Sequence, residues 1–157
     1  MMELLTAIEG SAFSIWVRES TSVLAYPTIL TLHTVGLAVL VGASTAVDLR
    51  FLGFGRQIEL EPMERFFPAM WIGFWINAIS GVMLWAADPI EKGTTLLFMA
   101  KLAIIAVGVV LIVLLRREVY GRARAAIVTP VAKAFAALSL LAWIAAIVTG
   151  RLMAYLT

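Results

Sequence analysis

Residues 94–115, TTLLFMAKLAIIAVGVVLIVLL, decide the fold class of this chain. This run of 22 residues contains a single charged side chain, that of Lys101. At about 1.5 Å per residue, a helix of this length crosses a hydrocarbon core of roughly 30 Å. A helix also satisfies its backbone hydrogen-bonding groups within the segment, which lipid requires. The sequence therefore predicts a transmembrane helix here.

Three further apolar stretches have the same character. They span about residues 22–47, 66–87 and 131–155. Hydrophobic residues make up 62% of the chain and charged residues 14%, whereas soluble proteins have about 45–50% and about 25%. A soluble domain of 157 residues could not bury so much apolar surface. We therefore predict an all-α fold, an integral membrane four-helix bundle that forms one domain over residues 1–157.

Residues 1–21 differ from the spans, because apolar side chains such as Leu4 and Trp16 alternate with charged ones such as Glu9 and Arg18. This mixture predicts a short amphipathic helix that lies at the membrane surface and precedes the bundle. A frayed tail is the alternative. The N-terminus has no early basic residue, so we expect no cleavable signal peptide.

The loops predict the orientation. Basic residues gather in the loops after the first and third predicted helices, eight in number, against three on the opposite side. The positive-inside rule places the first side in the cytoplasm and both termini outside, in the periplasm of a bacterium. The eight are Arg50, Arg56, Arg65, Arg116, Arg117, Arg122, Arg124 and Lys133, and the three are Arg18, Lys92 and Arg151.

Polar side chains inside the predicted helices are the candidate functional residues, because ionisable groups in a bilayer are costly. His33 lies about ten residues into the first helix, on the order of 15 Å deep. It either donates to a backbone carbonyl as a packing residue, or binds a ligand or handles protons. Asn77, near the middle of the second helix, is expected to hydrogen-bond across helices. Lys101 either snorkels to the head groups or lines a polar site.

Asp48 and Arg50 end the first predicted helix. Two residues apart, their side chains do not face each other on a helix. We therefore expect each to pair with another element, such as Arg116 or Glu118, and to fix helix ends.

Small residues recur at helical spacing, which lets membrane helices approach closely. Gly73, Asn77 and Gly81 form such a stripe on the second predicted helix, and we expect it to face the bundle interior. A second stripe on the first helix favours a homo-oligomer or another membrane subunit as partner; it consists of Ala38, Gly42 and Ala46.

Residues 33–55, HTVGLAVLVGASTAVDLRFLGFG, resemble the first helix of an uncharacterised bacterial family of small four-helix membrane proteins, a domain of unknown function. In that family an intramembrane histidine precedes a glycine-bearing apolar run that ends in Asp-Leu-Arg-x-Leu-Gly. Lys101 and the pair Gly150–Arg151 also match. The resemblance implies the fold and the bacterial inner membrane, and little about activity.

A looser likeness, to copper-resistance-D-type membrane proteins and to b-type cytochrome helices, rests on the setting Leu-His-x-x-Gly around His33. This chain has one histidine, so it cannot form a two-histidine haem site within one subunit.

The sequence excludes several classes of function. The chain has no cysteine, which excludes disulfides, iron–sulfur clusters, thiolate zinc sites and cysteine nucleophiles. Its net charge of +2 is too small to suggest a nucleic-acid partner. No nucleophile–base set or phosphate loop is visible, so independent catalysis is not expected.

Three hypotheses remain. In the first, the protein is an accessory or haem-binding subunit of a membrane redox system. His33 would bind the iron of haem b, Gly36 would clear space for the macrocycle, and Lys101 with Arg151 would meet the propionates. A second ligand would come from Met83, Met99 or another chain. The second hypothesis is a small transporter or an ion- or proton-handling protein. The third is a structural subunit without a cofactor.

Overall fold

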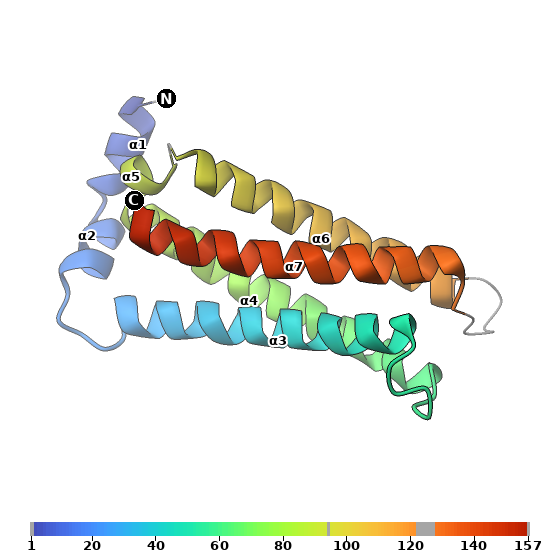
Figure 1. Cartoon of the computed structure of the whole chain (residues 1–157). Helices are drawn as coiled ribbons and strands as arrows, with labels where there is room; N and C mark the ends of the chain where they lie inside the picture. The colour runs from blue at the N-terminus through green and yellow to red at the C-terminus, as the bar shows by residue number, and fades with distance from the viewer. Residues whose placement is uncertain (1, 94, 122–127, 157) are drawn as a thin grey trace.

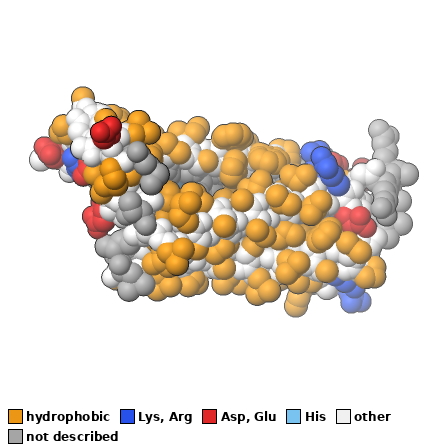
Figure 2. All heavy atoms as spheres, turned by 90° about the horizontal axis from the view of Figure 1, so that it is seen from above, with side chains coloured by type: hydrophobic (Ala, Val, Ile, Leu, Met, Phe, Trp, Pro, Cys, Tyr) orange, Lys and Arg blue, Asp and Glu red, His pale blue; other side chains and the backbone are white. Residues whose placement is uncertain are grey.

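The computed structural model describes residues 2–93, 95–121 and 128–156, and every regular element in these ranges is helical. Four long helices run side by side: α3 (Tyr26–Leu52), α4 (Phe66–Ala87), α6 (Leu96–Tyr120) and α7 (Pro130–Leu156) (Figure 1). All four are long and apolar enough to cross a membrane. Figure 2 shows hydrophobic side chains along the middle of the bundle and charged ones towards its two ends. The prediction of an all-α membrane bundle is confirmed.

The helix boundaries differ from the predicted spans at several ends. One helix begins later than predicted, and two helices continue into polar residues beyond their apolar runs. The first predicted span begins at 22, but α3 begins at Tyr26, where Pro27 occupies the first turn. The helix α3 then continues through Asp48 and Arg50 and ends at Leu52, where it is capped by Gly53, whose φ of 107° favours glycine. Likewise α6 continues five residues beyond the predicted end at 115, to Tyr120. Apolarity sets the part of a helix that lipid surrounds, whereas the helix itself can extend into water.

The N-terminal segment forms two short helices, α1 (Met2–Glu9) and α2 (Ala12–Glu19), so the prediction of a single helix over 1–21 is wrong. The break lies at Gly10 and Ser11, because the Ser11 side chain caps α2 by accepting a hydrogen bond from the Ser14 backbone N–H. Figure 1 shows α1 and α2 beside one end of the bundle, where both termini and the short helix α5 (Pro89–Gly93) also lie. We call this the capped end and the opposite one the loop end.

The helix α2 is docked on the last turn of α4. Ser14 is fully buried, and its hydroxyl lies 2.5 Å from the Ala86 carbonyl oxygen. The Arg18 guanidinium donates to the Ala87 carbonyl oxygen at 2.9 Å and pairs with Glu9 at 3.5 Å. These donors satisfy carbonyls that the end of a helix leaves unpaired. The N-terminal segment is therefore packed against the bundle.

The bundle consists of two tight helix pairs, α3 with α4 and α6 with α7, joined mainly where α3 packs on α7. In the first pair the two backbones touch. A Cβ added to Gly36 would lie 2.6 Å from the Asn77 backbone nitrogen, and one added to Gly73 would lie 2.6 Å from the Leu40 nitrogen. Only hydrogen fits at these two positions, and the absence of side chains lets the helices approach.

A compact apolar core fills the loop-end half of the bundle. Trp143 of α7 is its largest fully buried side chain. It lies against α6, where a Cβ on Gly108 would approach the indole ring to 2.9 Å. Other members of this core include Leu40, Val47, Phe51, Phe67, Met70, Ile112 and Leu115. The capped-end half, in contrast, contains cavities.

We predict that Gly73→Leu disrupts the bundle while Gly42→Leu does not. A leucine at 73 would collide with α3 backbone, and overpacking a core costs about 1–3 kcal/mol. A Cβ on Gly42 would meet nothing within 4 Å. Unfolding in mixed micelles should show the first variant destabilised and the second equal to wild type. Equal stability of both variants would contradict the α3–α4 contact.

Two residues of the small-residue stripe predicted on the first helix, Ala38 and Gly42, are exposed. The third, Ala46, is half-buried and packs against the apolar core, so only part of the stripe faces outward. The homo-oligomer stays a prediction.

Candidate functional site

His33 lies on α3 in the capped-end half of the bundle, half-buried against α4. Its Nδ1 atom lies 3.0 Å from the Asn77 backbone carbonyl oxygen and 3.2 Å from the Ser80 hydroxyl oxygen. A carbonyl oxygen can only accept a hydrogen bond, so the ring donates from Nδ1. In the neutral ring, Nε2 then carries the lone pair.

The Nε2 atom has no hydrogen-bond partner among the described residues. A ring whose Nδ1–H is held by a backbone carbonyl has a fixed orientation and presents Nε2 as a possible ligand. The imidazole is therefore arranged as a metal-binding histidine usually is, with one nitrogen anchored and the other open.

Asn77 holds the same contact from the side of α4. Its side-chain Nδ2 donates to the His33 backbone carbonyl oxygen at 2.8 Å. Ser80 is turned back to its own helix, where its hydroxyl lies 2.6 Å from the Ile76 carbonyl oxygen. Asn77 thus fixes α3 to α4 at the level of the imidazole.

The space that the sequence analysis assigned beside Gly36 does not exist, because α4 backbone occupies it. The glycine that faces the imidazole is Gly81, where a Cβ would lie 3.0 Å from the His33 Cε1 atom. The sequence contained a signal for this residue, since Gly81 belongs to the predicted stripe with Gly73 and Asn77. It contained no signal for Ser80.

Lys101 reaches the same region from α6. Its side chain is half-buried and lies along Gly150 of α7, where a Cβ would approach Lys101 Cε to 3.4 Å. Among the described residues its ammonium group has neither a hydrogen-bond partner nor an ion pair. The structure therefore brings together His33 and Lys101, which lie 68 positions apart in the sequence.

Three cavities meet at His33 and Lys101. One of about 380 Å³ lies between α4 and α6, and another of about 380 Å³ opens towards the capped end, near Glu91 and Lys92. A third of about 250 Å³ lies between α3 and α7. Ligand sites typically measure about 300–1,000 Å³ and combine apolar walls with a few polar groups. Aromatic side chains that the sequence analysis did not assign to a site supply these walls: Phe74 and Trp85 of α4 and Phe98 of α6.

Arg151 lines the smallest cavity, but its side chain is exposed. The guanidinium donates to the Tyr155 hydroxyl at 3.0 Å and lies 5.2 Å from the centre of that ring. Arg151 and Lys92 are therefore cations at the rim of the site, and Lys101 is the cation within it.

The two methionines predicted as second iron ligands lie elsewhere. Met99 is 59% exposed on the outer face of α6. Met83 packs with Val17 and Ile29 beneath α2. Neither side chain lines a cavity that His33 lines, so the structure does not bring either methionine to the imidazole within one chain.

Asp48 and Arg50 also have partners other than the predicted ones. Asp48 is 2% exposed and accepts a hydrogen bond from Ser44 at 3.2 Å, and the Ser44 oxygen lies 3.3 Å from that of Ser139 on α7. The Arg50 guanidinium donates to the Ile58 carbonyl oxygen at 2.6 Å, within the loop that follows α3. The buried acid thus joins α3 to α7 through hydroxyl groups.

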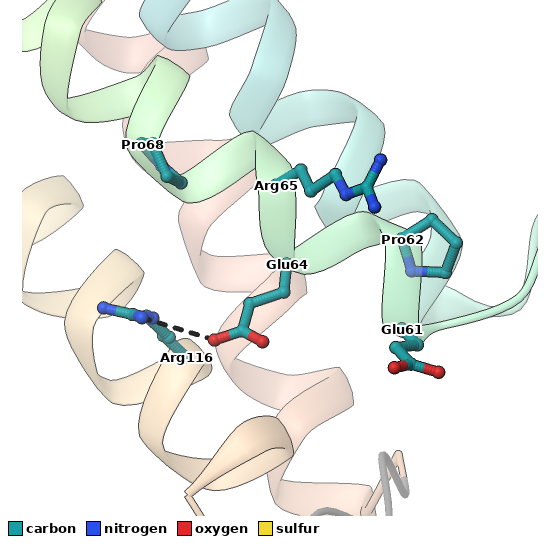
Figure 3. A pocket seen from close by; sticks show the side chains of 6 residues that line it. All are labelled: Glu61, Pro62, Glu64, Arg65, Pro68 and Arg116. Carbon is teal, nitrogen blue, oxygen red and sulfur yellow. Dashed lines mark hydrogen bonds and ion pairs between the residues drawn. The ribbon is translucent and has the colours of Figure 1, made fainter.

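At the loop end, Arg116 of α6 pairs with Glu64 at 3.3 Å. Glu64 belongs to the 3-10 helix η1 (Glu61–Arg65), and Figure 3 shows the pair beside an open surface depression. Both side chains are about half exposed, so the pair contributes little stability. This depression lacks the convergence of enclosed polar groups found at His33.

Comparison with known proteins identifies no relative: no protein-family model, no curated protein and no solved structure matches this chain.

Proposed function

We propose that this protein is a haem-binding accessory subunit of a bacterial membrane redox system, with His33 as the iron ligand. The observation that carries the proposal is the His33 ring, which is anchored at Nδ1 by the Asn77 carbonyl, has no hydrogen-bond partner at Nε2 among the described residues, and belongs to a residue that lines three adjoining cavities. A bound haem b would supply one-electron chemistry.

The surroundings of His33 fit such a group. Phe74, Trp85 and Phe98 offer apolar walls to a macrocycle. Lys101 offers a positive charge to a propionate from within the site, and Lys92 and Arg151 offer charges at the rim. Burying an unpaired ammonium group costs several kcal/mol, so an acidic ligand at Lys101 would stabilise the protein.

A second iron ligand, where one is used, would come from another chain. Met83 and Met99 lie away from the cavities. The exposed small residues Ala38 and Gly42 of α3 are one place where a second copy could pack. A homo-oligomer or a complex with other membrane subunits therefore accords with the proposal.

Transport along a polar path within one chain is less well supported. The cavities at His33 lie on one side of the core formed by Leu40, Met70 and Trp143. Asp48 lies 15 residues further along α3, or about 22 Å at the rise of a helix. In the space lined by Leu40, Met70 and Ile112 there is no room for water.

The absorption spectrum of protein purified from haem-sufficient cells tests the proposal. A Soret band that persists through purification supports haem binding. A colourless protein that cannot be loaded with haem would contradict it and favour the cofactor-free alternatives.

We also propose that the capped end faces the periplasm across the inner membrane. Six of the eight basic residues predicted for the cytoplasmic side lie at or near the loop end; the other two, Arg122 and Arg124, lie outside the described residues. A C-terminal alkaline phosphatase fusion should therefore be active, and a fusion after Arg122 inactive. The opposite activities would refute this orientation.

A further inference from the structure

We infer that the His33 site exchanges its ligand with the bilayer, through a side opening between α4 and α6, and that this ligand is an apolar molecule bearing an acidic group. The inference rests on the proposed function for the identity of the ligand, but not for the existence of the opening.

The opening follows from the way the helices pair. The helix α4 packs on α3, and α6 packs on α7, so α4 and α6 have little close backbone contact. Their side chains meet at the loop end, where the Phe67 ring lies 5.8 Å from the Tyr120 ring, between centroids. The cavity of about 380 Å³ between them is lined on one side by α4 and on the other by α6, with His33 of α3 completing it. Within the described part of the chain, α7 and the loops contribute no residue to this lining.

The walls of the opening are apolar. Val82 of α4 and Leu102 of α6 line the cavity and are 63% and 47% exposed on the outer surface of the bundle. Both residues belong to helices that cross the membrane, so the surface they share faces lipid. An apolar ligand would pass between these side chains without entering water.

The polar groups of the cavity define the chemistry of the ligand. The polar side chains among its lining residues are those of His33, Asn77 and Lys101, together with the indole of Trp85. Asn77 donates to the His33 carbonyl, while the Lys101 ammonium has no anionic partner among the described residues. A carboxylate would supply that partner, whereas an entirely apolar molecule would leave the buried charge unpaired.

Spin labels can test the opening without any ligand, because the chain has no cysteine. Ala78→Cys places a label in the cavity wall, Val110→Cys on the lipid-facing side of α6, and Gln57→Cys in an exposed loop. In proteoliposomes, the Ala78 label should collide with oxygen in preference to a water-soluble nickel chelate, as the Val110 label does. A preference for nickel, as expected at Gln57, or protection from both agents would overturn the inference.

Ligand transfer tests the route, with haemin in phosphatidylcholine vesicles as the probe. Val82→Trp combined with Leu102→Trp should fill the opening with two indole rings. Haemin could then enter only after these side chains move, so the rate at which the Soret band grows should fall at least about tenfold. Ile79→Trp combined with Val107→Trp, on outward-facing positions of the same helices, should leave the rate unchanged.

Leu84→Trp tests the competing route from the capped end, since Leu84 lines only the cavity that opens there. If Leu84→Trp slows transfer and the Val82/Leu102 variant does not, the lateral route is refuted. If wild-type protein takes up no haemin, the haem proposal fails, and the spin-label result alone decides whether the opening exists.

Discussion

His33→Ala should abolish haem binding while the protein still folds and inserts. The imidazole Nε2 is the only nitrogen of the ring without a partner in the described structure, and the substitution removes it. Loss of even a supporting residue at a metal site typically costs about 10–100-fold in affinity. We therefore expect a loss of at least about 100-fold, measured by haemin titration of the Soret band in detergent.

Thr31→Ala is the matched control for this experiment. Thr31 lies two residues before His33 on α3 and lines none of the three cavities, and its exposed hydroxyl donates to the Pro27 carbonyl oxygen at 2.7 Å. This variant should retain the wild-type spectrum. If His33→Ala also retains the spectrum, the ligand assignment is wrong, and His33 is then a packing residue that joins α3 to α4.

Asp48→Ala should produce the largest loss of stability at a single polar position. The substitution leaves the buried Ser44 and Ser139 hydroxyls without the carboxyl group between α3 and α7. An unsatisfied buried polar group costs about 1–3 kcal/mol. Unfolding in mixed micelles should show a destabilisation of about this size, and Asp48→Asn, which keeps an acceptor oxygen, should show less.

A triple variant separates this hydrogen-bonding role from a simple change in volume. Replacing all three residues, with Ser44→Ala, Ser139→Ala and Asp48→Leu, removes every polar partner together. Such a replacement is often nearly neutral, so we expect the triple variant to be more stable than Asp48→Ala. A triple variant that is less stable would show that the cluster is not held mainly by its hydrogen bonds.

The sequence by itself determined the fold class and the approximate helices. Length and apolarity are properties of each segment alone, so the run at 94–115 predicts a membrane-spanning helix whatever its neighbours are. The span at 66–87 agrees with α4 at both ends. The sequence also placed His33 and Lys101 within these helices, because depth in a span follows from position along it.

Tertiary structure decided which residues meet. A helix surrounded by lipid is apolar on its outer face as well as on its inner one, so the hydrophobic pattern does not fix its rotation. For that reason the sequence suggested free space beside Gly36, whereas α4 backbone occupies that space and Gly81 faces the imidazole. The partners of Asp48 depend on the packing of α3 against α7 in the same way.

The side opening likewise required the structure. It exists because α3 pairs with α4, and α6 with α7, which leaves α4 and α6 apart beside His33. Pair choice depends on close backbone contact at Gly36 and Gly73, a match between two surfaces that neither helix carries alone. Sequence therefore determined the helices and the depth of the polar groups, and only packing decided the site that they form.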